Sequence, residues 1–107
     1  MTVRTAFLPG LMLIGTLAAG AAVAQDADAG KEIYQSVCKN CHGPTAQGMA
    51  SYPGLSDKEP DYIVDRLETY RAGERIGPNS MLMIPHAKRL SDDDITDVAA
   101  YVTTAFD

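Results

Sequence analysis

Apolar residues recur at steps of three and four positions in three stretches of the chain, and no stretch alternates polar and apolar residues. Residues 28–41 form the first predicted helix. The second begins near Pro60, which suits a first helical turn, and ends before Gly73, a typical C-terminal stop. The third begins at Ser91, whose hydroxyl caps it while Asp94 completes a capping box. The sequence therefore predicts an all-α fold with three main helices.

Gly30 lies on the apolar face of the first predicted helix, where a glycine costs about 1 kcal/mol relative to alanine. A glycine at this position indicates that another helix approaches the backbone closely. Residues 43–59 and 73–89, which separate the predicted helices, contain several prolines and glycines. We expect both of these segments to be irregular.

The N-terminal stretch has the pattern of an export signal. Arg4 gives a basic start, no charged residue follows until Asp26, and Ala22-Val23-Ala24 is a small-x-small cleavage site. We predict a signal peptide over residues 1–24 and one domain over residues 25–107. The alternative is an uncleaved anchor, because the uncharged stretch is long enough to span a bilayer. Its proline, Pro9, and its glycines favour cleavage, which would leave no stable membrane insertion.

Cys38-Lys39-Asn40-Cys41-His42 has the Cys-x-x-Cys-His pattern to which a c-type haem is attached covalently. Two thiols on one helical turn can both reach the haem vinyl groups, and the imidazole of His42 then lies under the iron. The alternatives are a lone disulfide, a redox Cys-x-x-Cys pair and half of a zinc site. A zinc site would need further ligands, yet there is no third cysteine and the only other histidine is His86. The sequence therefore predicts one haem c, which would also stabilise a small core.

Acidic residues outnumber basic ones, with 14 against 9 in the whole chain, and all but one of these charges lie in residues 25–107. This balance argues against a nucleic-acid partner. It suits a redox protein partner with a basic docking patch. The sequence contains no paired carboxylates or activated nucleophile, so we predict that the protein is not an enzyme.

The order of helix, Cys-x-x-Cys-His, loop with Pro53 and Leu55, helix, methionine segment and final helix resembles class I c-type cytochromes. Residues 62–75 and 83–95 are similar to the small bacterial monohaem type, and in particular to one haem domain of the cytochrome subunit of flavocytochrome c sulfide dehydrogenases. The resemblance implies a cytochrome c fold in which the helices wrap around one haem and the first and last helices cross. With the export signal, it implies a periplasmic electron carrier.

The resemblance also implies roles for single residues. The carbonyl of Pro53 would accept a hydrogen bond from His42, and Leu55 would pack on the haem. Arg75 would pair with a haem propionate or remain exposed. Met83 would be the sixth ligand, because it lies seven residues before the leucine of the Ala-Lys-Arg-Leu segment. Met81 is the second candidate for that ligand and would otherwise pack on the haem edge.

These features predict single-electron transfer from a donor enzyme, such as a sulfide or sulfite dehydrogenase, to an oxidase or another cytochrome. One alternative is a cytochrome subunit held tightly by a sulfur-oxidising enzyme. A second is a haem enzyme or gas sensor with an open distal position. His86 is a weaker candidate for the distal ligand than either methionine, because its neighbours match the stretch that normally follows the ligand.

Overall fold

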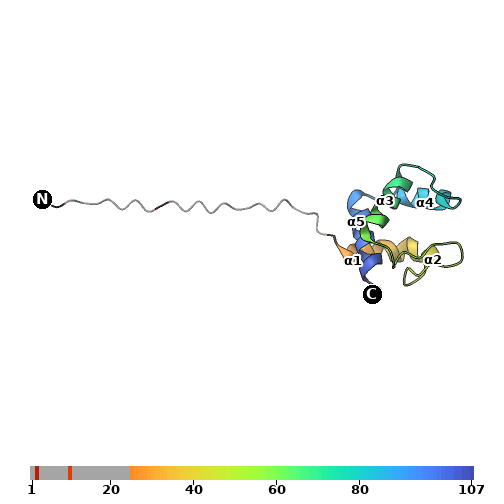
Figure 1. The fold of residues 1–107 in the computed structure, drawn as a ribbon, viewed down its shortest axis with the longest axis horizontal. Coiled ribbons are helices and arrows are strands. Elements are labelled where there is room, and N and C mark those ends of the chain that lie inside the picture. The colour runs from red at the N-terminus through yellow and green to blue at the C-terminus, as the bar shows by residue number, and fades with distance from the viewer. Residues whose placement is uncertain (1, 3–9, 11–24) are drawn as a thin grey trace.

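The computed structural model describes residues 2, 10 and 25–107, and the predicted signal peptide and its cleavage site lie almost wholly outside them. The described domain is helical (Figure 1). Its elements are α1 (Ala27–Ile33), the π-helical segment η1 (Tyr34–Cys38), α2 (Lys39–His42), α3 (Pro60–Arg71), α4 (Ser80–Ala87) and α5 (Asp92–Thr104). The all-α prediction is confirmed. No helix among the described residues has the length and apolar character needed to cross a membrane.

The first predicted helix is confirmed, and it contains one turn that the sequence did not indicate. The Asp26 carboxylate caps its start by accepting hydrogen bonds from the backbone N–H groups of Asp28 and Ala29. Within η1, the N–H of Lys39 donates to the carbonyl of Tyr34, five residues back. Such wide turns are uncommon inside helices and often lie at functional sites. Here the wide turn leads directly into the Cys-x-x-Cys-His motif.

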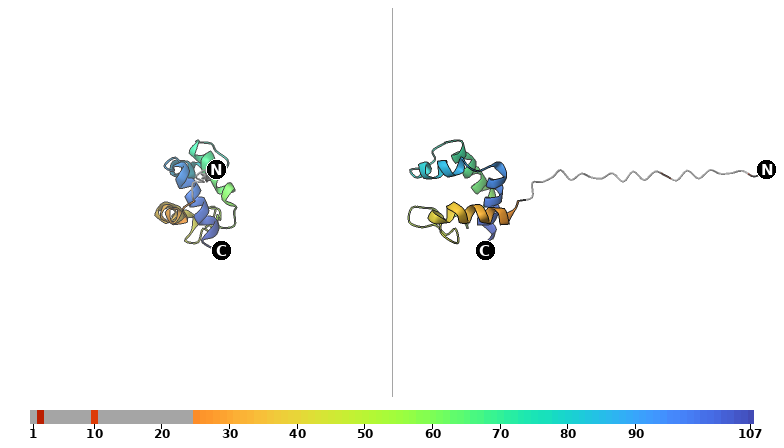
Figure 2. Two further views of the ribbon diagram at one scale, coloured as in Figure 1. Left: turned by 90° about the vertical axis from the view of Figure 1, so that its left-hand side faces the viewer. Right: turned by 180° about the vertical axis from the view of Figure 1, so that it is seen from behind.

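Helix α5 crosses α1, as Figures 1 and 2 show. A Cβ atom on Gly30 would collide with the carbonyl of Asp97 and would lie 2.9 Å from the backbone nitrogen of Val98. The backbone N–H of Asp26 donates to the Asp97 carboxylate over 2.8 Å, which joins the start of α1 to α5. The close approach predicted at Gly30 is therefore confirmed.

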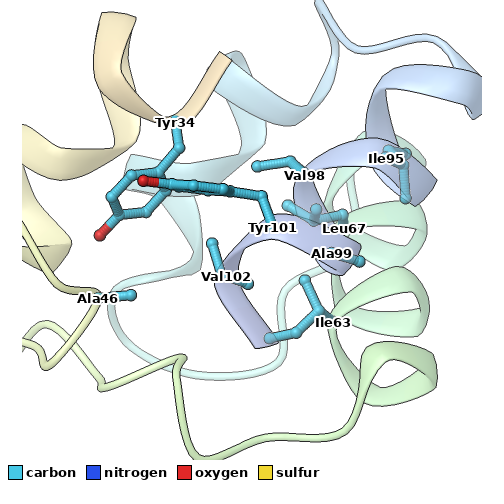
Figure 3. Close-up of a cluster of buried hydrophobic side chains, with 9 residues drawn as sticks. All are labelled: Tyr34, Ala46, Ile63, Leu67, Ile95, Val98, Ala99, Tyr101 and Val102. Atoms are coloured by element: carbon cyan, nitrogen blue, oxygen red, sulfur yellow. The ribbon is translucent and has the colours of Figure 1, made fainter. Parts of the chain in front are cut away.

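The core lies between η1, α3 and α5 (Figure 3). Its buried members are Tyr34, Ala46, Ile63, Leu67, Ile95, Val98, Ala99, Tyr101 and Val102. The rings of Tyr34 and Tyr101 pack with their centroids 5.7 Å apart, and Phe106 lies against both. Aromatic pairs at such distances stabilise a core beyond the area they bury. The apolar stripes predicted for the three main helices thus meet in one cluster.

The methionine segment differs from the prediction, because residues 80–87 form α4 rather than irregular chain. The hydroxyl of Ser80 accepts hydrogen bonds from the N–H groups of Ile76 and Gly77, which folds the preceding turn back onto the helix start. Pro85 lies inside α4 but close to its end, so it removes only one hydrogen bond from a short helix. The prolines and Asn79 indicated a loop, whereas residues 80–87 form a helix that packs against α3.

Candidate functional site

A cavity of about 560 Å³ lies between the α2 side of the domain and helices α3 and α4. Its volume is in the range of small-molecule and cofactor sites, and most of its wall is apolar. The residues that line it include the predicted attachment and ligand residues Cys38, Cys41, His42 and Met83. The fold therefore brings the two ends of the predicted site, which are about forty positions apart in the sequence, to one cavity.

His42 is buried at the end of α2, and its Nδ1 atom lies 2.8 Å from the carbonyl oxygen of Pro53. A carbonyl can only accept, so Nδ1 carries the proton and donates it to Pro53. The other ring nitrogen, Nε2, is then left with its lone pair available for a metal. A hydrogen bond of this kind fixes the orientation of a ligating imidazole and strengthens it as a donor.

The loop that follows His42 is fixed by short-range bonds. Gly43 and Gly48 have φ values of 92° and 84°, a backbone region that favours glycine. The N–H of Gly48 donates to the carbonyl of His42 over 2.8 Å, and the N–H of Leu55 donates to the carbonyl of Ala46 over the same distance. These bonds hold Pro53 in place beneath the imidazole, and Leu55 lines the cavity.

Tyr34 connects the first helix to the same loop. Its hydroxyl donates to the carbonyl of Gly43 over 2.6 Å, next to His42 in the chain, and its side chain is buried. Burial raises the pKa of Tyr34 to about 12, so the hydroxyl keeps its proton and remains a donor at neutral pH. The sequence analysis did not find this contact. An aromatic residue at helical spacing indicates only a core position.

Cys38 and Cys41 line the cavity as free, half-buried thiols. Cys38 is the last residue of η1, and Cys41 lies in α2. They are not joined to each other, so the structure does not support the alternative of a lone disulfide. Burial raises the pKa of the Cys38 thiol to about 11, so the thiol is uncharged at neutral pH. Both sulfur atoms are therefore placed for bonds to a ligand that fills the cavity.

The distal methionines have different environments. Met83 is half-buried, lines the cavity and packs against the core cluster. Met81 is 58% exposed and is not part of the cavity wall, which does not favour the expectation that it packs on the haem edge. The two residues lie on opposite sides of α4 because positions two apart in a helix do not share a face. His86 lines the cavity as well, although much of its side chain is exposed.

Two cationic residues that the sequence analysis did not single out line the cavity, and the one that it did single out does not. Arg75 is exposed and lies outside the cavity wall. Lys58 and Arg66 are part of that wall, together with Tyr62. Part of the signal is visible afterwards, because Tyr62 and Arg66 are four positions apart in α3 and therefore share one helix face, whereas Lys58 precedes the helix.

The residues present fit a covalent haem better than a bare metal ion. No cluster of three or more histidine, cysteine or acidic side chains that could hold a metal ion occurs within residues 25–107. The cavity instead presents two free thiols, one oriented imidazole and one thioether within a largely apolar wall. A haem needs this combination: thiols for attachment, two axial ligands and an apolar enclosure.

Comparison with known proteins gives the same result. The family model described as cytochrome c matches residues 27–106. Cytochrome c-554(548) of Halomonas halodenitrificans is 43% identical over 82 residues, which cover 76% of this chain and 98% of that protein. Cytochrome c-554(547) of Halothiobacillus neapolitanus is 35% identical over 89 residues, with the same coverage. The thiosulfate dehydrogenase electron acceptor of Stutzerimonas stutzeri is 37% identical over 65 residues, which cover 60% of this chain and 30% of that protein.

Proposed function

The chain belongs to the cytochrome c family, and we propose that it carries single electrons in the periplasm from a dehydrogenase of sulfur compounds to a downstream oxidase or cytochrome. Like its relatives, the chain is an electron carrier and not an enzyme. It binds one haem c covalently through Cys38 and Cys41, with His42 and Met83 as axial ligands.

The observation that carries this function is the pairing of His42 and Met83 in one cavity. When bound, the haem supplies a one-electron couple, whose potential a histidine and methionine ligand pair raises. The protein contributes geometry: Pro53 orients the imidazole, and α4 places the thioether of Met83 in the cavity. His42 and Met83 would hold both axial positions of the bound haem, which would leave no position open for oxygen or sulfide. This separates a carrier from a haem enzyme or gas sensor.

Two observations support a sulfur-compound dehydrogenase as the donor. A relative named as a thiosulfate dehydrogenase electron acceptor shares 37% of 65 residues with this chain. In addition, we infer from the sequence of residues 62–75 and 83–95 a resemblance to a haem domain of the cytochrome subunit of flavocytochrome c sulfide dehydrogenases. The export pattern of residues 1–24 supports a periplasmic location.

A cytochrome subunit held tightly by such an enzyme is the second candidate. Ile76 and Leu82 line the cavity, but Met81 is 58% exposed and lies outside the cavity wall, which favours this candidate. A large apolar side chain that neither the core nor the cavity uses is available to a protein interface. A transient carrier instead relies on charge to speed its encounters.

Reduction of the purified protein by a thiosulfate or sulfide dehydrogenase at increasing salt concentration separates the two candidates. For a transient carrier we expect the rate to fall steeply as the screening length decreases from about 30 Å to about 10 Å. A rate that does not change, with a complex that survives gel filtration, would identify a tightly held subunit. Charge removal at Lys39 or Lys88 should change the rate more than charge removal at Asp107. Absence of any reduction by either enzyme would exclude these donors.

A further inference from the structure

The charges that line the cavity do not follow those of the whole chain. Acidic residues outnumber basic residues by 14 to 9 in the sequence. Among the described residues that line the cavity, Lys58 and Arg66 are basic, and there is no aspartate or glutamate. An electropositive wall in an acidic protein suits a ligand that carries negative charge.

Both cations are held by the same aromatic ring. Lys58 precedes α3, and its Nζ atom lies 5.9 Å from the centre of the Tyr62 ring. The Cζ atom of Arg66, one turn further along α3, lies 5.1 Å from the same centre. Cations at these distances are attracted to the face of a tyrosine ring. The contacts therefore restrict both long side chains to the cavity wall.

Neither cation has a strong competing partner among the described residues. Lys58 lies 3.5 Å from the carboxylate of Asp57, but the Asp57 side chain is 74% exposed. An exposed pair of this kind contributes little to stability, and water can replace it. Arg66 is in no ion pair in the described part of the chain, where the two pairs are those of Lys58 and Arg71. Both cations are thus available to a ligand in the cavity.

We propose that Lys58 and Arg66, held by Tyr62, form the subsite for the carboxylate side chains of the haem. The haem is otherwise apolar, and a carboxylate that leaves water needs a charged or hydrogen-bonding partner. A guanidinium can donate two parallel hydrogen bonds to a carboxylate, and an ammonium adds a point charge. The subsite replaces the expected role of Arg75, whose side chain is outside the cavity wall. It rests on the covalent haem and is independent of the redox partner.

The test uses the purified protein with its covalent haem and three variants that each remove one positive charge: Lys58→Gln, Arg66→Gln and the control Arg75→Gln. His86 also lines the cavity and is the weaker candidate for the distal ligand, so all measurements are made in a His86→Gln background. Proton NMR of the ferric protein follows the paramagnetically shifted methylene signals of the haem propionates as the pH is raised. The midpoint potential is measured on the same samples.

Loss of a nearby cation weakens the charged form of a carboxylate, so we expect the propionate titration to move upward by about one unit or more in Lys58→Gln and Arg66→Gln. Removal of a positive charge near the iron should also lower the midpoint potential, at pH values above the propionate titration. Arg75→Gln should change neither property. An equal or larger shift in Arg75→Gln, or no shift in the other two variants, would overturn the subsite. Such a result would leave the haem attachment and carrier function intact, because those are read from haem staining and from the donor assay.

Discussion

The cavity has two sides that the protein builds differently: a proximal region, residues 34–55, and a distal region, residues 73–90. In the proximal region the imidazole, the loop and the first helix are joined by buried hydrogen bonds, including those from His42 to Pro53 and from Tyr34 to Gly43. The distal region has one short helix, which packs mainly on α3, and one serine that closes the turn before it. Several of its large apolar side chains remain exposed.

The difference indicates how each axial side chain is held in place. His42 is held by hydrogen bonds within the protein, whereas Met83 would be held in large part by its own bond to the iron. A buried hydrogen bond is costly to break because the group left unpaired stays desolvated. A short helix with few neighbours opens at a lower free energy. The proximal region is therefore built to hold His42 at a fixed place, whereas the distal region depends more on the bond made by Met83. Changes on the two sides should differ in size and in kind.

The largest effect is expected when the covalent attachment is removed. Cys38→Ala combined with Cys41→Ala should leave little folded protein with haem, because a small core depends on its cofactor. The unmodified protein, isolated from the periplasm, should keep haem peroxidase stain on a denaturing gel. Its mass should equal residues 25–107 plus one haem. Extraction of the haem by acid and acetone would contradict covalent attachment, and a mass that includes residues 1–24 would contradict cleavage.

The next effect separates the two methionines of the distal region. Met83→Ala should abolish the weak near-infrared absorption of the ferric iron–sulfur bond and lower the midpoint potential, because the thioether ligand raises it. Met81→Ala is the matched control: its side chain is 58% exposed and lies outside the cavity wall. It should preserve the absorption and the potential. If the two variants exchanged these results, Met81 would be the ligand.

The two regions were also unequally predictable from the sequence. The proximal motif is read directly, because Cys-x-x-Cys-His has a fixed spacing imposed by the chemistry of attachment. Helix ends at Pro60 and Ser91 followed from local capping rules, which depend on neighbouring residues only. In the distal region Pro85 indicated irregular chain, but the structure places it inside α4. That outcome depends on packing against α3, which no local rule contains.

Within the site, the type of haem ligand was easier to predict than which basic side chains reach the cavity. The resemblance implied both residues, but Met83 had a fixed register with the following leucine, whereas Arg75 had no such register. The structure instead brings Lys58 and Arg66 to the cavity, and both lie well before Arg75 in the sequence. Which basic side chain reaches a cavity depends on how a helix is rotated against its neighbours. The π-helical turn η1 is another feature of this kind, because a wide turn has no clear sequence signal.

A third effect concerns the stability of the crossing between α1 and α5 at Gly30. Gly30→Ala places a methyl group against the backbone of Asp97 and Val98, which cannot move without shifting α5. Overpacking against backbone should lower the free energy of unfolding by about 3 kcal/mol, although alanine favours the helix itself by about 1 kcal/mol. Lys31→Ala is the control in the same helix, because Lys31 is exposed and its replacement adds no atoms at the helix crossing. Equal denaturant midpoints for the two variants would show that the helix crossing tolerates a side chain.

The smallest effect concerns one hydroxyl of the proximal region. Tyr34→Phe keeps the ring in the core but leaves the buried carbonyl of Gly43 without its donor, so the free energy of unfolding should fall by about 1 kcal/mol at neutral pH. Burial raises the pKa of Tyr34 from 10.0 to about 12. The contribution of its hydroxyl is therefore complete below pH 10 and is lost as the pH rises to about 12, because the unfolded chain releases the proton first.

The difference in unfolding free energy between the unmodified protein and Tyr34→Phe should accordingly shrink across that pH range. Denaturant unfolding followed by far-ultraviolet circular dichroism at pH 8 and at several values between 10 and 12 measures it. Tyr62→Phe is the matched control, because the Tyr62 ring is 44% exposed and its loss of a hydroxyl should leave stability nearly unchanged. A difference that stays constant up to pH 12 would mean that Tyr34 ionises in the folded protein as readily as in the unfolded chain. The hydrogen bond to Gly43 would then not be what fixes the proximal loop.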